Sequence, residues 1–154
     1  MVNIENRDIE AEIITDNQSD SEDIQTVDVS DVVVYARDWT IETIFNQINI
    51  ENIDLNPKFQ RRNAWNDDKR SKLIESIIMG YPVPEIVLAE NPNKKRSFIV
   101  IDGKQRLLTL AGFIDNNKYK YWDKPVLKGL KVLKDLNKLK YVDLDEKSKR
   151  EFDN

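Results

Sequence analysis

The stretch FIVIDGKQRLLTL, residues 98–110, decides the fold because it joins a strand to a helix within a few residues. It begins with a β-branched and aromatic run, passes through Asp-Gly-Lys-Gln-Arg at 102–106, and ends in an apolar pattern of helical period. β-Branched and aromatic residues favour strands, and a glycine permits a sharp turn. The stretch therefore predicts a strand, a tight corner and a helix, in that order.

Two interpretations of this corner follow from its residues alone. In the first, Asp102 is the N-cap of the helix, Gln105 completes a capping box, and Gly103 eases the turn. That interpretation leaves Lys104 and Arg106 in the first helical turn, where the helix dipole prefers an anion. In the second, the glycine-containing helix start and the two cations cradle the phosphates of a nucleotide. The residues leave both interpretations open.

The rest of the chain predicts further elements of an α/β (α+β) domain. The predicted helices are 41–48, 67–79 and the one that follows Asp102. The predicted strands are 32–36, 50–55, 86–89 and 97–101, and the last two form a hairpin. Beyond Pro125 the leucines recur every third residue, which fits no single helical face, so no element is predicted there.

Composition limits the possible functions. The chain has 154 residues, 40% of them hydrophobic, which suits one domain with its own core. It has no cysteine and no histidine, so disulfides, thiolate metal sites and Ser-His chemistry are excluded, and no metal site is predicted. No apolar run approaches a membrane span and no signal pattern is present, so we expect a cytoplasmic protein with no membrane partner.

Charge divides the chain into two parts. Residues 1–31 hold ten acids and one base, a net charge of −9, whereas 32–154 carry a net charge of +5. The first part also lacks aromatic residues, so we predict a disordered acidic leader before a domain at 32–154. The leader is interpreted either as a solubilising tail or as a screen for a basic surface.

Three ordered blocks resemble the N-terminal domain of GmrSD-type restriction enzymes. The blocks are FQRRNAW at 59–65, KLIESIIMGYPVPEIVL at 72–88 and IDGKQRLLTL at 101–110. The resemblance covers about residues 38–152 and implies a ParB/sulfiredoxin-like fold, a small mixed sheet with flanking helices. A further strand that follows in the family has no counterpart here, so we expect a domain truncated at its C-terminal end.

The resemblance also implies a nucleotide site. The hallmark Asp-Gly-Gln-Gln-Arg of the family, associated there with binding and hydrolysing a nucleoside triphosphate, falls on residues 102–106. The residues assigned to nucleotide and phosphate binding on this basis are Gln60, Arg61, Gly103, Lys104 and Arg106. Asp102 and Gln105 are the expected catalytic residues, which orient water or Mg²⁺. Because Lys104 stands where the family most often has glutamine, hydrolysis stays an open question.

The implied function is that of a nucleoside-triphosphate-binding regulatory domain in a DNA restriction or phage-defence system. The nuclease of such a system is a separate HNH-type domain or subunit that needs histidine, so no nuclease activity is expected from this chain. Two alternatives stay open. One is a ParB-like, nucleotide-gated DNA-binding switch without turnover, and the other is a non-enzymatic module that acts on a restriction complex.

Other basic and aromatic residues have two interpretations each. Lys94, Lys95 and Arg96, at the tip of the predicted hairpin, form either a DNA contact or an ordinary solvated turn. Lys69, Arg70 and Lys72 could track phosphates, but a solvated helix face is the favoured interpretation. The tryptophans at 39, 65 and 122 could stack bases, but packing is the favoured interpretation.

Overall fold

The computed structural model describes residues 38–55 and 65–154, which belong to one compact unit, Ala36–Asn154. The predicted features that lie outside the described residues are the leader at 1–31, the strand at 32–36, Gln60 and Arg61. Within the described ranges no helix is long and apolar enough to cross a membrane.

Two of the predicted helices are confirmed, with their caps. Helix α2 spans Ile41–Asn49, and the Thr40 hydroxyl accepts a hydrogen bond from the Thr43 amide at 3.1 Å. Helix α3 spans Asp67–Ile78, and the Asn66 side chain accepts from the Lys69 amide at 2.9 Å. Each cap satisfies one of the N–H groups that a helix start leaves without an intrahelical partner.

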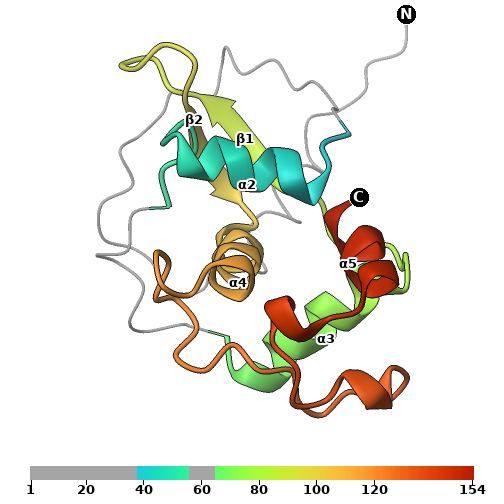
Figure 1. The fold of residues 1–154 in the computed structure, drawn as a ribbon. Helices are drawn as coiled ribbons and strands as arrows, with labels where there is room; N and C mark the ends of the chain where they lie inside the picture. The colour runs from blue at the N-terminus through green and yellow to red at the C-terminus, as the bar shows by residue number, and fades with distance from the viewer. Residues whose placement is uncertain (1–37, 56–64) are drawn as a thin grey trace, which may run out of the picture. The chain divides into compact units, whose positions relative to one another are not determined.

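The hairpin is confirmed as well. Strand β1, Val87–Glu90, pairs antiparallel with strand β2, Phe98–Asp102, and Leu88 lies opposite Val100. The sheet found among the described residues has these two strands (Figure 1). The α+β class is therefore confirmed, whereas the ParB/sulfiredoxin-like assignment with a mixed sheet stays a prediction.

The strand predicted at 50–55 is wrong. Only Ile53 makes a β-bridge, parallel to Phe98. The amides of Asn52 and Ile53 instead both donate to the Gln47 carbonyl, at 2.9 and 3.2 Å, and Glu51 adopts a positive φ of 57°. The segment therefore turns back on the last turn of α2, and that turn overrides the alternating pattern.

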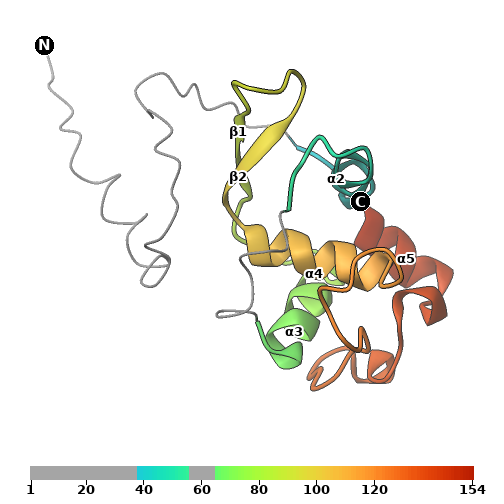
Figure 2. The ribbon, with the colours of Figure 1, turned by 90° about the vertical axis from the view of Figure 1, so that its left-hand side faces the viewer.

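Helix α4, Lys104–Ile114, lies at the centre of the described unit (Figures 1 and 2). Every residue from Arg106 to Phe113 is buried, as expected for a helix enclosed on all sides. Leu110 and Phe113 join a cluster with α3, α5 and the C-terminal leucines, whereas Leu107 and Leu108 join a second cluster with α2 and the hairpin. Because β2 leads directly into α4, the corner between them is fixed by both clusters.

The leucines after Pro125 lie in short, mostly non-helical structure. One 3₁₀ helix, η3 at Lys134–Leu136, lies among them. A second, η4 at Tyr141–Asp143, and helix α5 at Glu146–Asp153 follow. Leu127, Leu130 and Leu136 are buried in the cluster around Phe113. The spacing of three thus reflects inward-facing positions of an irregular segment.

Side chains of α3 hold this irregular segment in place. The buried Ser71 hydroxyl accepts from the Lys128 amide at 3.0 Å. The buried Glu75 carboxylate accepts from the amides of Val132 and Leu133, at 2.9 and 2.8 Å. These bonds satisfy backbone donors that the segment cannot pair internally.

Candidate functional site

The corner at 102–106 is not a capped helix start of the predicted kind. Gly103, not Asp102, is the N-cap residue, with φ 91° in the left-handed region, and no side chain caps the helix. Asp102 is the last residue of β2, and its carboxylate pairs with Arg106 at 2.7 Å. The prediction that Asp102 is the N-cap is therefore wrong, because the turn is made one residue later and its acid bonds to a side chain.

The capping box is also absent, since Gln105 has a different role. Its side-chain oxygen accepts a hydrogen bond from the backbone amide of Trp65 at 3.2 Å. This bond joins α4 to the residues just before α3, forty positions earlier in the chain. Trp65 closes the sequence block that contains Gln60 and Arg61, which themselves lie outside the described residues.

Arg106 is a buried tie between three segments. Its Nη2 donates to the Asp102 carboxylate at 2.7 Å and to the Glu85 carbonyl at 2.9 Å, so it links α4, β2 and the residues before β1. The side chain is only 9% exposed, and its Nε is buried with no hydrogen-bond partner among the described residues. A buried donor without a partner is costly, so this Nε is a candidate contact for an anion or a water molecule.

Gly103 is required by close packing as well as by its backbone conformation. A Cβ atom there would lie 2.9 Å from Ile86 Cγ1 and 3.2 Å from the Arg106 guanidinium. Side chains avoid such distances, and L-residues rarely adopt a φ of 91°. The absence of a side chain therefore lets the helix start approach both the hairpin and the arginine.

The electrostatics of the helix start favour an anion. The first turn of α4 contains no acidic residue but holds Lys104, which is partly buried, and Arg106. The positive end of the helix dipole adds to both cations, and Asp102 offsets part of their charge. Backbone N–H groups at a helix start, a glycine and cations together form the usual binding site for phosphate.

The donor set fits phosphate better than it fits a metal ion bound by the protein alone. Across 38–55 and 65–154, no three Asp, Glu, His or Cys side chains lie close enough to hold a metal ion. Mg²⁺ is commonly bound through one or two carboxylates together with the phosphates of a nucleotide. Asp102, whose side chain is 54% exposed, is the carboxylate at the corner that could supply such a contact.

A comparison with protein families gives a match over most of the chain. A model of the family described as GmrSD restriction endonuclease, N-terminal domain, matches residues 41–154, about three quarters of the chain. The chain belongs to this family. No curated protein and no solved structure gives a match. In this GmrSD N-terminal domain, the matched residues include all of α2, α3, the hairpin, α4 and α5.

The basic hairpin tip is tied to the domain at one of its three positions. Lys94 Nζ donates to the Glu51 carbonyl at 2.9 Å, so this side chain turns toward the end of α2. Lys95 and Arg96 are exposed, and Arg96 has a positive φ of 61°. DNA contact by these three residues stays a prediction.

The interpretation of α3 as carrying a solvated basic face is wrong for Arg70. Its side chain is buried, with the guanidinium 5.8 Å from the centre of the Trp122 ring. Burial lowers the pKa of Arg70, and the nearby Asp67 opposes that shift. Lys69 and Lys72 are exposed as predicted, and Lys69 lies 4.5 Å above the Trp65 ring.

The predicted packing role holds for two of the tryptophans. Trp122 is fully buried in the cluster around Phe113. Trp39 meets Phe98 edge to face, with ring centres 5.7 Å apart. Both rings are therefore packed against other side chains of the protein, as the packing interpretation predicts.

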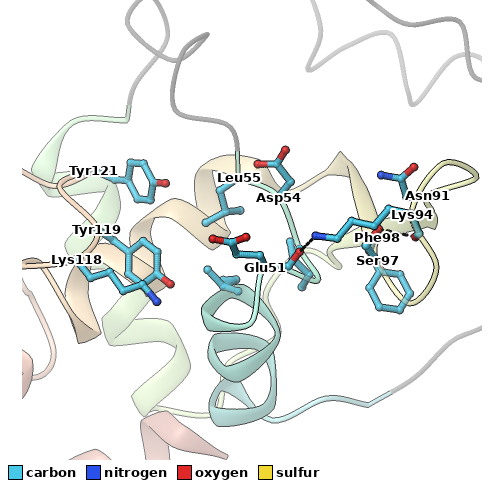
Figure 3. Close-up of a pocket in the computed structure, with 12 residues that line it drawn as sticks. Glu51, Asp54, Leu55, Asn91, Lys94, Ser97, Phe98, Lys118, Tyr119 and Tyr121 are labelled. Carbon is cyan, nitrogen blue, oxygen red and sulfur yellow. Dashed lines mark hydrogen bonds between the residues drawn. The ribbon is translucent and has the colours of Figure 1, made fainter.

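A second hollow was missed by the sequence interpretation. A pocket of about 400 Å³ lies between the end of α2, the hairpin turn and residues 118–121 (Figure 3). Its lining residues are Ile48, Glu51, Ile53, Asp54, Leu55, Asn91, Lys94, Ser97, Phe98, Lys118, Tyr119 and Tyr121. They come from three separate segments and form no motif, so only Lys94 carried a signal, as part of the basic tip.

Proposed function

We propose that this domain binds a nucleoside triphosphate through its phosphates at the corner between β2 and α4. The observation that carries the proposal is the start of α4, where a left-handed Gly103 leaves the helix without a side-chain cap and two cations occupy an acid-free first turn. In a restriction system, such a site would let nucleotide binding control a separate HNH-type nuclease domain or subunit. Cleavage is assigned to that partner, since this chain has no histidine.

The structure suggests different roles for the two cations. Lys104, partly buried in the first turn, would contact a phosphate as a point charge. Arg106 is buried and its Nη2 is already engaged, so it would act mainly by fixing the corner, and its buried Nε is a donor with no partner among the described residues. Gly103 would let the start of α4 pack closely against Ile86 and Arg106, which leaves the uncapped backbone N–H groups of the first turn to a phosphate.

The expected catalytic residues, Asp102 and Gln105, both make contacts within the protein, and these contacts affect how well they could support hydrolysis. Asp102 is paired with Arg106 but more than half exposed, so it can still reach a nucleotide-bound Mg²⁺. The Gln105 oxygen accepts the Trp65 amide, which fixes its side chain. With Lys104 in place of the glutamine common in the family, these restraints favour the alternative of a nucleotide-gated DNA switch with little turnover.

A thermal-shift screen with ATP, GTP, CTP and UTP, each with and without Mg²⁺, tests the proposal. A ligand at a hundred times its Kd stabilises the folded state by about 2.7 kcal/mol, so one nucleotide should raise the Tm by several degrees. Lys104→Ala should weaken that nucleotide about tenfold or more, because a charge-assisted contact is lost. Lys131→Ala, an exposed lysine after α4, is the matched control and should have no effect.

The outcomes separate the alternatives. No shift with any of the four nucleotides would contradict the proposal and leave the interaction-module alternative. Binding with negligible phosphate release would select the switch, and steady release would select the hydrolase. If the glutamine common in the family supports turnover, Lys104→Gln should raise phosphate release relative to the wild type.

A further inference from the structure

The pocket beside the hairpin is separate from the proposed triphosphate site. Phe98 lines the pocket at the start of β2, whereas Asp102 ends the same strand at the corner. Four residue steps along a strand separate the two positions by about 13 Å. A ligand in the pocket would therefore use a set of side chains that the corner does not use.

One wall of the pocket is aromatic. Tyr119 and Tyr121 stack with ring centres 5.9 Å apart and an angle of 21° between the rings. Tyr119 is buried, and its hydroxyl donates to Asn49 Oδ1 at 2.7 Å, so the stack rests on a fixed ring. Tyr121 is only partly buried, and burial together with Tyr119 and Asp54 raises the pKa of its phenol.

Two lysines border the pocket at fixed positions. Lys94 Nζ donates to the Glu51 carbonyl and Lys118 Nζ to Asn49 Oδ1, each at 2.9 Å. Both contacts place a cation at the C-terminal end of α2. The negative end of the helix dipole favours a cation there, so neither lysine needs a ligand to hold its position. Lys118 Nζ also donates to the Asn49 carbonyl at 3.4 Å, so of the three N–H donors of each ammonium, two are left on Lys94 and one on Lys118.

Two carboxylates, those of Glu51 and Asp54, complete the set of groups. Figure 3 shows the tyrosines with Lys118 on one side of the pocket, Lys94 with Phe98 on the other, and Glu51 between them. An aromatic surface, two cations and carboxylate acceptors match three features of a nucleotide, which are the ring of its base, its phosphates and the exocyclic amine that some bases carry. A base stacks on the ring, phosphates meet ammonium groups, and carboxylates accept hydrogen bonds from exocyclic amines, as in contacts to cytosine N4.

We propose that this pocket binds one unpaired nucleotide, with its base against the Tyr119–Tyr121 wall and its phosphates toward Lys94 and Lys118. The volume of about 400 Å³ lies within the range of small-ligand sites. The same chemistry is offered by a free nucleotide and by a nucleotide within a single strand. This inference does not depend on the triphosphate site at the corner.

Fluorescence anisotropy of the full chain with a labelled ten-nucleotide oligo-dC strand tests this inference. Parallel titrations use labelled oligo-dT, a labelled ten-base-pair duplex, and unlabelled dCMP as competitor. We expect oligo-dC to bind more tightly than oligo-dT, which lacks an exocyclic amine, and the duplex to bind weakly. Competition by dCMP at the concentration of the strand would identify the free nucleotide as the ligand, and competition only at much higher concentration would identify the strand.

Matched variants place the ligand in the pocket. Tyr121→Leu should weaken oligo-dC about tenfold, whereas Tyr121→Phe keeps the ring and should stay within twofold. Lys94→Gln should weaken binding and lower the salt slope by about 0.7, the value for one phosphate contact with a single strand. Lys95→Gln, the neighbouring exposed lysine that does not line the pocket, should do neither.

Three results would overturn the inference. They are the absence of binding by both oligo-dC and dCMP, equal binding of duplex and single strand, and an affinity that Tyr121→Leu leaves unchanged. Melting curves show that each variant is folded. Lys104→Ala should leave oligo-dC binding intact, so a failure of the triphosphate proposal would not affect this test.

Discussion

The two ends of strand β2 differ in how their side chains are used. At Asp102 the strand enters a closely packed corner, where a buried arginine links three segments and a Cβ on Gly103 would collide with Ile86. At Phe98 it borders an open pocket of about 400 Å³, lined by exposed lysines, the buried Tyr119 and the partly buried Tyr121. Five consecutive residues, 102–106, carry the polar side chains of the corner, whereas three distant segments supply those of the pocket.

This difference shows why only one of the two sites was visible in the sequence. Close packing at a turn demands particular residues at adjacent positions, such as a glycine with positive φ followed by an arginine three residues later. A pocket needs only that suitable side chains converge after folding. Substitutions at the corner should therefore lower the free energy of unfolding, whereas substitutions in the pocket should weaken ligand binding without changing the stability of the fold.

The largest expected effect is that of Gly103→Ala. The new Cβ would meet Ile86 at 2.9 Å and force a left-handed backbone on alanine, so we expect a loss of about 3 kcal/mol in the free energy of unfolding. Gly80→Ala is the matched control, since φ is 66° there but no atom lies within 4 Å, and it should cost about 1 kcal/mol. Urea denaturation measures both. Equal losses would mean that the corner is not closely packed.

Arg106→Ala should come next, with a loss of about 2–3 kcal/mol, because it removes a buried side chain whose hydrogen bonds to the Glu85 carbonyl and to Asp102 join three segments. Neither interpretation of the corner drawn from the sequence gives Arg106 a role in stability, and the burial of its side chain is the reason to expect one. Asp102→Ala should cost only about 0.5–1 kcal/mol, since that side chain is half exposed. Denaturant melts in which the two changes cost the same would contradict this order.

A smaller effect is expected for Tyr141, whose hydroxyl donates a hydrogen bond to Asp153. Burial and its hydrogen bonds to Asp153 raise the pKa of Tyr141 from 10.0 to about 12. Because the pKa is higher in the folded state than in the unfolded state, the protonated phenol stabilises the fold. That contribution is fully present below pH 10 and is lost as the pH rises from 10 to 12. The difference in stability between the wild type and Tyr141→Phe should therefore shrink over that window. A constant difference in melts from pH 9 to 12 would show that the phenol is not restrained.

The smallest effect is expected for Tyr121→Phe and Lys94→Gln, which change the pocket. These partly exposed or exposed side chains have no buried partner to lose, so stability should stay within about 0.5 kcal/mol of the wild type. Thermal melts check this. A loss comparable to that of Arg106→Ala would show that the pocket residues support the fold, which would remove the contrast between the two ends of β2.

The sequence predicted the elements whose signals are local. Thr40 and Asn66 mark the starts of α2 and α3, and the apolar runs on both sides of the turn-forming NPNKKR mark β1 and β2. It failed where tertiary contacts decide the structure. The pattern at 50–55 resembles a strand, but hydrogen bonds to Gln47 turn that segment back on α2.

At the candidate site, the sequence located the corner but not the partners of its side chains. Asp102 and Gln105 fit a capping box by spacing, yet Asp102 pairs with Arg106, and Gln105 accepts the amide of Trp65, forty residues away. A partner so distant in the chain cannot be inferred from spacing. Arg70 was misjudged for the same reason, because its burial depends on Trp122.

The central claim is that the start of α4 binds a nucleoside triphosphate. NMR titration of the ¹⁵N-labelled chain with the nucleotide that gives the largest thermal shift tests it most directly. We predict saturable shifts of the backbone amides of 103–106, which should weaken in Lys104→Ala and persist in Tyr121→Leu. Shifts confined to residues outside the corner, or no shifts at millimolar nucleotide, would contradict the account.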